Sequence, residues 1–167
     1  MQMAVSENDA SNNTEKESFM LQALSLAEEA AEKGEVPVGC IITDSKGNII
    51  AQGSNRCREN MDPTAHAEME AIREACKVIG DWHLDGCTIY VTLEPCPMCV
   101  GAIMNSRIRR LVYGAKDPVK GACGSVIDLF SEHFPDKAAV YGNVLGKESG
   151  ELLSTFFSSL REGKSNC

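Results

Sequence analysis

Apolar residues recur along the chain with two different periods, and each change of period marks a new structural element. Over residues 19–27 they repeat at the spacing of one helical face, after a capping-box pair at Thr14 and Glu17, until Gly34 ends the pattern. Two short apolar runs then flank the turn-forming stretch SKGN. The pattern predicts an amphipathic helix followed by a β-hairpin over residues 38–55.

The rest of the chain alternates predicted strands with predicted helices. Asp62, Pro63 and Thr64 are start signals for a helix that ends at Gly80. The β-rich run CTIYVTLE follows, and Pro95 then stands where a helix can begin, because its missing N–H would have no partner there. RRLVYGA and AAVYGN predict two more strands, and KESGELLSTFFSSLREG predicts a terminal amphipathic helix.

This order of elements predicts an α/β fold. A hairpin followed by alternating strands and helices places helices on both faces of one sheet, which gives a three-layer α/β/α arrangement. At 167 residues the chain fits one domain. Its opening stretch is polar and lacks an apolar period, so we expect a disordered leader over residues 1–15, the folded domain over 16–162 and a flexible tail over 163–167.

Composition also bears on the cellular compartment. No apolar run reaches the roughly 20 residues that a membrane span needs, and no basic segment precedes an apolar core at the N-terminus. The chain has eight cysteines, but a domain of this length does not need disulfides for stability. The sequence therefore predicts a cytoplasmic protein with no membrane partner.

The formal net charge of −8 argues against a nucleic-acid partner, because nucleic-acid sites are usually basic. The charge is unevenly distributed, however. Residues 1–35 contain eight acidic and two basic side chains, whereas residues 100–125 contain five basic side chains and one acidic. The five basic residues are Arg107, Arg109, Arg110, Lys116 and Lys120. A solvated surface and an RNA contact are both compatible with such a cluster.

Two short motifs contain residue types that bind zinc. TAHAEMEAI places His66 and Glu68 in the first turn of one predicted helix, and EPCPMC places Cys96 and Cys99 in the first turn of the next. His66 and Glu68 are about 200° apart around a regular helix, so they can converge only at a helix end. Two helix N-termini would then meet, and their partial positive charge favours the thiolates that bind zinc.

The combination of residues also suggests chemistry. His66, Cys96 and Cys99 make three protein ligands, which leaves one tetrahedral position for water, as in catalytic zinc sites. Zinc can lower the pKa of bound water toward roughly 7, and Glu68 is then predicted to shuttle protons to a ring nitrogen and a leaving amine. Taken alone, Cys-x-x-Cys fits a structural zinc half-site, a redox pair or a chance spacing about equally well. Together with His-x-Glu it matches the signature of zinc nucleobase deaminases.

Six motifs follow one another in the order of a known enzyme family: GEVPVG, GSNR, DPTAHAEMEAI, TIYVTLEPCPMCVGAI, SRIRRLVYGAKDPVKGACGS and LLSTFF. On these motifs, over about residues 18–160, the chain resembles the cytidine deaminase superfamily and, within it, the bacterial tRNA adenosine deaminases. The resemblance implies a cytidine-deaminase-like fold with a five-stranded mixed sheet, one Zn²⁺ per subunit and a homodimer. It also implies conversion of adenosine to inosine at the wobble position of a tRNA anticodon stem-loop.

The resemblance implies roles for individual residues as well. In the metal site it assigns the same three ligands and the same catalytic glutamate. Asn55 corresponds to a polar contact with the flipped nucleoside, and Asp117 to a contact with a neighbouring ribose hydroxyl. Pro37, Val38 and Leu93 would line the slot for the base. From the residues alone, Asn55 could instead end a strand, and Asp117 could instead start a turn.

The chain departs from its relatives at the C-terminus. After Phe156 and Phe157 it continues with SSLREGK, where relatives often have a more basic helix. These two aromatic residues and the five cations of residues 100–125 are the candidates for RNA contact. The zinc motifs are also shared with guanine deaminases, which act on a free base, so a free-guanine deaminase is the alternative function. A non-catalytic binding module built on a structural zinc is the second alternative.

Overall fold

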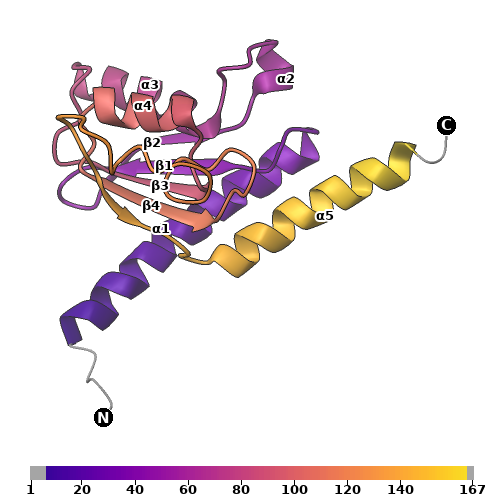
Figure 1. The fold of residues 1–167 in the computed structure, drawn as a ribbon, viewed down its shortest axis with the longest axis horizontal. Coiled ribbons are helices and arrows are strands. Elements are labelled where there is room, and N and C mark those ends of the chain that lie inside the picture. The colour runs from indigo at the N-terminus through magenta and orange to yellow at the C-terminus, as the bar shows by residue number, and fades with distance from the viewer. Residues whose placement is uncertain (1–6, 165–167) are drawn as a thin grey trace.

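The computed structural model describes residues 7–164, in which five strands form one mixed sheet in the order β2-β1-β3-β4-β5 (Figure 1). The strands are β1 (Gly39–Thr43), β2 (Ile49–Ser54), β3 (Thr88–Leu93), β4 (Arg110–Ala115) and β5 (Ala139–Tyr141). β1 pairs antiparallel with both β2 and β3, whereas β3, β4 and β5 pair parallel to one another. The predicted hairpin and the predicted five-stranded mixed sheet are therefore confirmed.

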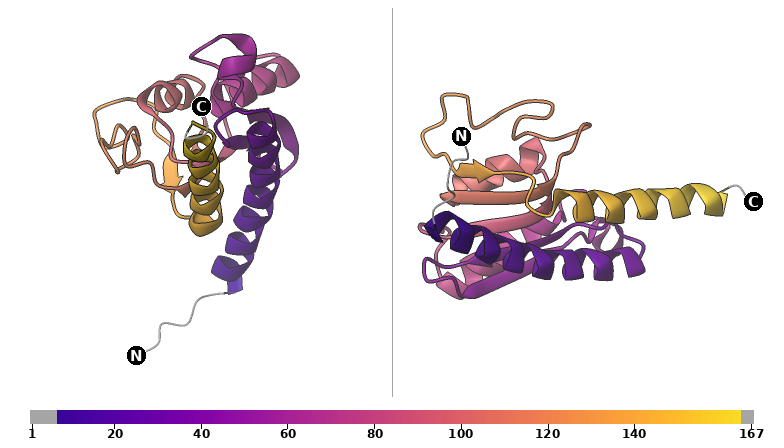
Figure 2. Two further views of the ribbon diagram at one scale, coloured as in Figure 1. Left: turned by 90° about the vertical axis from the view of Figure 1, so that its right-hand side faces the viewer. Right: turned by 90° about the horizontal axis from the view of Figure 1, so that it is seen from below.

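Helices cover both faces of this sheet. They are α1 (Glu7–Glu32), α2 (Cys57–Asn60), α3 (Ala67–Ile79), α4 (Pro97–Asn105) and α5 (Gly146–Lys164). Helices α3 and α4 lie on one face, and α1 and α5 run alongside each other on the other face (Figure 2). This is the predicted three-layer arrangement. Within residues 7–164, no helix is long and apolar enough to cross a membrane.

The core is divided between the two faces of the sheet. Ile42 and Ile89 pack toward α3 and α4, whereas Ile41 and Tyr90 pack with Met20 of α1. Neighbouring residues of a strand point to opposite faces, so both Ile41 and Ile42 are buried only because both faces are covered. This explains why β1 and β3 read as nearly continuous apolar runs in the sequence.

The described helices extend beyond both predicted ends of the folded domain. Helix α1 begins at Glu7, so residues 7–15, which the sequence assigns to a leader, are helical. The Asn13 side chain donates a hydrogen bond to Glu17 at 3.4 Å, and once the buried part of a helix is formed each further residue adds to it at little cost. At the other end α5 runs to Lys164, two residues into the predicted tail. The remaining parts of the leader and tail, residues 1–6 and 165–167, lie outside the described residues.

A close approach between backbones positions the first turn of α3. A Cβ atom at Gly53 in β2 would overlap the carbonyl oxygen of Ala67, the first residue of α3. Only glycine therefore allows the helix to begin this close to the sheet. Since His66 and Glu68 flank Ala67, Gly53 decides how near the sheet these two side chains lie.

Candidate metal centre and catalytic pocket

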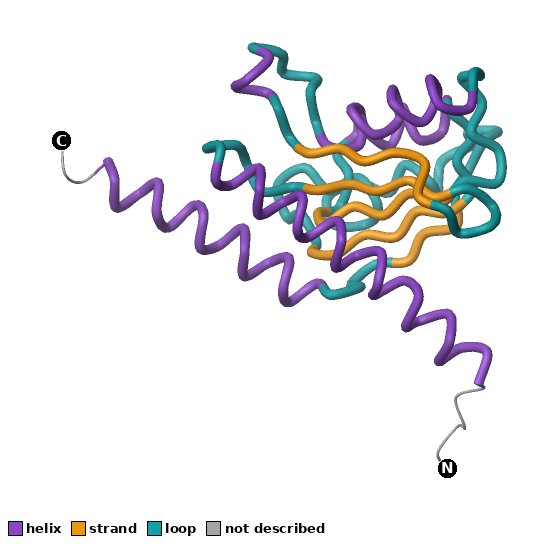
Figure 3. The backbone as a smooth tube through the Cα atoms, turned by 180° about the vertical axis from the view of Figure 1, so that it is seen from behind, coloured by secondary structure: helices purple, strands orange, loops and turns teal. Residues whose placement is uncertain are grey.

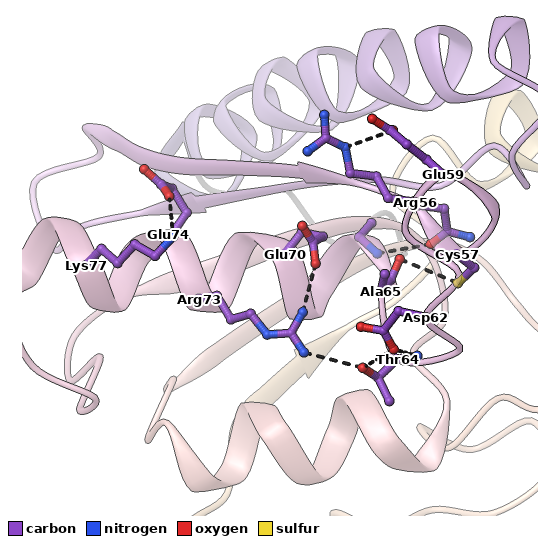
Figure 4. Close-up of polar contacts among 12 residues, drawn as sticks. Arg56, Cys57, Glu59, Asp62, Thr64, Ala65, Glu70, Arg73, Glu74 and Lys77 are labelled. Carbon is purple, nitrogen blue, oxygen red and sulfur yellow. Dashed lines mark hydrogen bonds and ion pairs between the residues drawn. The ribbon is translucent and has the colours of Figure 1, made fainter.

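Hydrogen bonds hold the segment between β2 and α3, which leads to His66, in place (Figure 4). Asp62 Oδ1 accepts hydrogen bonds from the backbone N–H of Thr64 at 2.8 Å and from its hydroxyl at 2.7 Å. Arg73 of α3 donates to Thr64 Oγ1 at 3.4 Å and forms an ion pair with Glu70 at 2.8 Å. These contacts tie the segment to the helix that follows it.

Two helices begin at the predicted metal ligands. His66 is the N-cap of α3 and Cys96 is the N-cap of α4, and each has an extended backbone conformation. His66 Nδ1 lies 3.7 Å from Cys96 Sγ and 3.5 Å from Cys99 Sγ, and the three donor atoms all lie within 4.8 Å of one another. A tetrahedral zinc ion, with bonds of about 2.1 Å to nitrogen and 2.3 Å to sulfur, separates such donors by about 3.6 Å. The donor set therefore fits zinc in both chemistry and spacing.

Hydrogen bonds among the three ligands favour a thiolate at this site. The hydrogen bond with Cys99 lowers the pKa of Cys96 to about 4, while the same contact raises the pKa of Cys99 well above its ordinary value. The hydrogen bond with Cys96 raises the pKa of His66. Cys96 is thus held in the ionised form that binds a metal, and the N-terminus of α4 adds partial positive charge beside it.

Glu68 is the second residue of α3, and only 4% of it is exposed to solvent. Burial raises the pKa of its carboxyl group to about 7, because the charged form loses contact with water. A carboxyl group with such a pKa is close to half protonated at neutral pH. That balance is what a group needs if it must both accept and donate a proton during one reaction.

A cavity of about 660 Å³ opens above these residues. It is lined by both metal-site and loop residues: Val36, Val38, Asn55, His66, Glu68, Leu93, Glu94, Cys96, Lys116, Asp117, Pro118, Val119, Lys120, Leu153, Ser154, Phe157 and Arg161. Of the three residues expected in the base slot, Val38 and Leu93 are in this wall. Pro37 is buried and is not part of it, and its neighbour Val36 takes that place.

Asn55 and Asp117 both line the cavity, and both also have a structural partner. Asn55 Oδ1 accepts a hydrogen bond from the backbone N–H of Ala67 at 3.0 Å, which leaves Nδ2 as the group that can donate to a substrate. Asp117 Oδ1 accepts from the backbone N–H groups of Val119 at 2.9 Å and Lys120 at 3.1 Å. Each side chain therefore lines the cavity and also stabilises the backbone conformation through hydrogen bonds with backbone N–H groups.

The structure separates the five basic residues that are close together in the sequence. Lys116 and Lys120 follow the C-terminal end of β4 and line the cavity, whereas Arg107, Arg109 and Arg110 lie at or just before its other end. A strand of six residues keeps the two groups roughly 17 Å apart or more. Arg109 forms ion pairs with Asp85 at 3.8 Å and Asp136 at 3.3 Å. The sequence cluster is therefore not one basic surface.

Helix α5 supplies one wall of the cavity. Leu153, Phe157 and Arg161 are spaced four residues apart, so they share a helix face, and all three line the cavity. Phe156 is partly buried and packs against Phe157 with ring centroids 5.5 Å apart. Figure 3 shows that the last turns of α5 extend past the edge of the sheet. The four-residue spacing is the sequence signal for Leu153 and Arg161.

Comparison with known proteins places the chain in a family. The zinc-binding region of the cytidine and deoxycytidylate deaminase family matches residues 13–115. The chain belongs to this deaminase family. The tRNA-specific adenosine deaminase of Bacillus subtilis (strain 168) is 46% identical to it over 152 residues, which are 90% of this chain and 94% of the relative. The resemblance seen in the sequence motifs is therefore confirmed.

Solved structures agree with this deaminase fold. A structure from work on A-to-I editing by tRNA:A34 deaminases at the wobble position of transfer RNA superposes with a TM-score of 0.77 at 46% identity, covering 81% of this chain and 99% of that one. The guanine deaminase from Bacillus subtilis superposes with a TM-score of 0.57 at 36% identity, covering 71% and 86%. Both comparisons confirm the cytidine-deaminase-like fold, and the first is similar over more of the chain.

Proposed function

We propose that the chain is a zinc-dependent hydrolytic deaminase that converts adenosine to inosine at the wobble position of a tRNA anticodon. The observation that carries the proposal is the cluster of one histidine and two cysteines beside a buried glutamate, with His66, Cys96 and Glu68 lining a single cavity. The similarity to the tRNA-specific adenosine deaminase of Bacillus subtilis over nearly the whole of both chains supports the choice of substrate.

The residues of the site divide the chemistry between them. His66, Cys96 and Cys99 would hold zinc, which when bound activates a water molecule for attack at neutral pH. The Glu68 carboxylate would accept a proton from the attacking water. It would return that proton to the ring nitrogen, then take the second proton of the same water molecule and deliver it to the exocyclic amine, so that adenosine and water give inosine and ammonia. The pKa of about 7 suits Glu68 to both steps.

Substrate recognition would come from the rest of the cavity wall. Val38 and Leu93 offer apolar contact to a base, and Nδ2 of Asn55 offers a hydrogen bond. Lys116 and Lys120 are exposed at the rim, where cations can neutralise RNA phosphates. A nucleotide of an anticodon loop is already partly unstacked, so turning it into the cavity costs less than flipping a base from a duplex.

Free guanine is the competing substrate, because guanine deaminases share the fold and the chain has 36% identity to one of them. The test supplies an adenosine-containing anticodon stem-loop and free guanine in parallel and measures inosine and xanthine. We expect inosine from the RNA and little xanthine. Rapid formation of xanthine without inosine would overturn the proposal in favour of a free-base enzyme.

We also propose a homodimer in the cytoplasm. Loop residues close to the cavity expose apolar side chains, with Val119 75% and Val126 58% exposed, and α4 presents Gly101 with open space beside it. Such a surface is suited to a second copy of the chain. The cysteines of the described residues are unpaired, which agrees with a reducing compartment. Light scattering at micromolar concentration should give twice the 18.0 kDa chain mass, and a monomer mass would contradict the dimer.

A further inference from the structure

Glu94 is a buried glutamate that the deamination chemistry does not use. It follows β3 directly, precedes the ligand Cys96 by two residues, and is only 2% exposed. A buried carboxylate is unfavourable unless hydrogen bonds compensate for the loss of water. The partners of Glu94 therefore show what it stabilises.

Among residues 7–164, every hydrogen bond to this carboxylate comes from one loop, residues 116–125. Oε1 accepts from the backbone N–H groups of Cys123 at 2.9 Å and Ser125 at 3.1 Å. Oε2 accepts from the backbone N–H of Asp117 at 3.0 Å and from the hydroxyl of Ser125. A carboxylate can accept about four hydrogen bonds, so the four donors occupy its whole capacity. No acceptor position remains for a substrate or for a proton in transit.

The loop is built to close around this group. A Cβ atom at Gly121 would lie 2.5 Å from Glu94 Oε2, so only glycine permits the backbone to pass there. The loop forms no strand or helix of its own, and most of its side chains on the cavity side are exposed. One further backbone bond, from Ala122 N–H to Pro95 O at 2.9 Å, ties the loop to the residue after Glu94.

The same loop carries much of the cavity wall. Lys116, Asp117, Val119 and Lys120 all line the cavity. The bond from Asp117 N–H to Glu94 is followed by the bonds from Val119 N–H and Lys120 N–H to the Asp117 side chain. A continuous set of hydrogen bonds therefore runs from the buried carboxylate to the residues at the rim.

We propose that Glu94 is a positioning residue for substrate binding. It holds the loop 116–125 in the shape that presents Asp117 and Lys120 to the RNA, and it takes no part in the proton transfers. The proposal rests on the proposed RNA substrate for its kinetic consequence. Its structural part, that the carboxylate holds the loop, does not depend on which substrate is used.

Glu94→Gln is the test, because glutamine has the same shape but replaces one acceptor oxygen with an NH₂ group that faces N–H donors. We expect about a tenfold rise in KM for the anticodon stem-loop and less than about a threefold change in kcat. This pattern is expected when the lost interaction stabilises the bound substrate and the transition state equally. Zinc content should stay at that of the wild type. Trypsin should cleave after Lys116 and Lys120 faster than in the wild type, which reports on the loop without any substrate.

Glu35→Gln is the matched control. Glu35 is also buried, at 3% exposed, and its Oε1 accepts from the backbone N–H groups of Arg58 and Glu59, both at 2.8 Å. The helix α2 that it holds contributes no residue to the cavity wall. Losing this carboxylate should therefore leave the KM and the cleavage after Lys116 and Lys120 unchanged.

The outcomes separate the two proposals. Unchanged cleavage and unchanged KM in Glu94→Gln would overturn the positioning role, and so would a loss of zinc or a fall in kcat at constant KM. If the wild type makes no inosine, the proposed RNA substrate fails while the trypsin result still tests the loop. If Glu94→Gln does not fold, Ser125→Ala removes one donor from an exposed residue and should raise both the KM and the cleavage rate about threefold. No change in Ser125→Ala would then reject the proposal.

Discussion

Glu68 and Glu94 lie in the wall of the same cavity and are buried to nearly the same degree, with 4% and 2% exposed, yet their pKa values move in opposite directions. Burial dominates at Glu68 and raises its pKa to about 7. Burial also acts to raise the pKa of Glu94, but the hydrogen bonds from Ser125, Asp117 and Cys123 together outweigh it and leave the pKa below its ordinary value. Burial alone therefore does not decide the state of a carboxyl group; the number of donors does.

This difference assigns the two glutamates to different tasks. A carboxyl group with few donors is free to exchange a proton, so Glu68 suits the chemistry. A carboxylate surrounded by four donors is fixed in its charge and position, so Glu94 is suited to holding the backbone of the loop 116–125 in place. In the proposed mechanism, helix α3 provides the reactive side of the cavity and the loop after β4 provides the binding side. Three variants besides Glu94→Gln test this division.

The largest effect is expected from His66→Ala. Loss of one of three ligands should remove zinc from the purified protein and reduce deamination to background, which metal analysis and an inosine assay would measure. The loop should keep its wild-type trypsin pattern, because all four donors to Glu94 come from residues 116–125. Cys76→Ala, which removes a thiol in the last turns of α3 away from the ligand set, should retain zinc. Zinc in the His66→Ala protein at the wild-type level would contradict the ligand assignment.

Glu68→Gln should reverse the kinetic pattern expected for Glu94→Gln. Without a proton shuttle, kcat should fall by at least ~10²-fold, while the KM and the zinc content stay close to those of the wild type. Glu70→Gln is the control on the same helix, since Glu70 pairs with Arg73 and does not line the cavity. Full activity in Glu68→Gln would contradict the assignment of Glu68 as the proton shuttle.

The smallest effect is expected from single cations. Lys120→Ala should weaken binding of the anticodon stem-loop by about three- to tenfold and reduce the slope of log K against log salt by about one, the change expected when one phosphate contact is lost. Arg110→Ala should change the affinity less, because Arg110 lies at the opposite end of β4 from the cavity. Equal losses in the two variants would mean that the RNA reaches both ends of the strand.

Much of the fold could be predicted from the sequence because its signals are local. The helical period of residues 19–27, the turn stretch SKGN and the start signals before Ala67 act between residues a few positions apart. The ligand set could be predicted for the same reason, since His66 and the Cys96–Cys99 pair each stand at a helix start that the neighbouring residues specify. No local signal predicts the one-turn helix α2, because it has no apolar period and its N-terminus is held by Glu35, more than twenty residues earlier.

Contacts between distant parts of the chain decided the rest. Glu94 bonds to residues 23 to 31 positions away, and nothing in EPC by itself shows that its glutamate would hold a loop. The five cations are close together in the sequence, but in the structure β4 separates them into two groups at opposite ends of the strand. Local sequence therefore determined which residues can bind zinc and which segments form helices and strands. Tertiary structure alone decided which carboxylate receives hydrogen bonds and which lysines reach the cavity, because both depend on groups that only folding brings together.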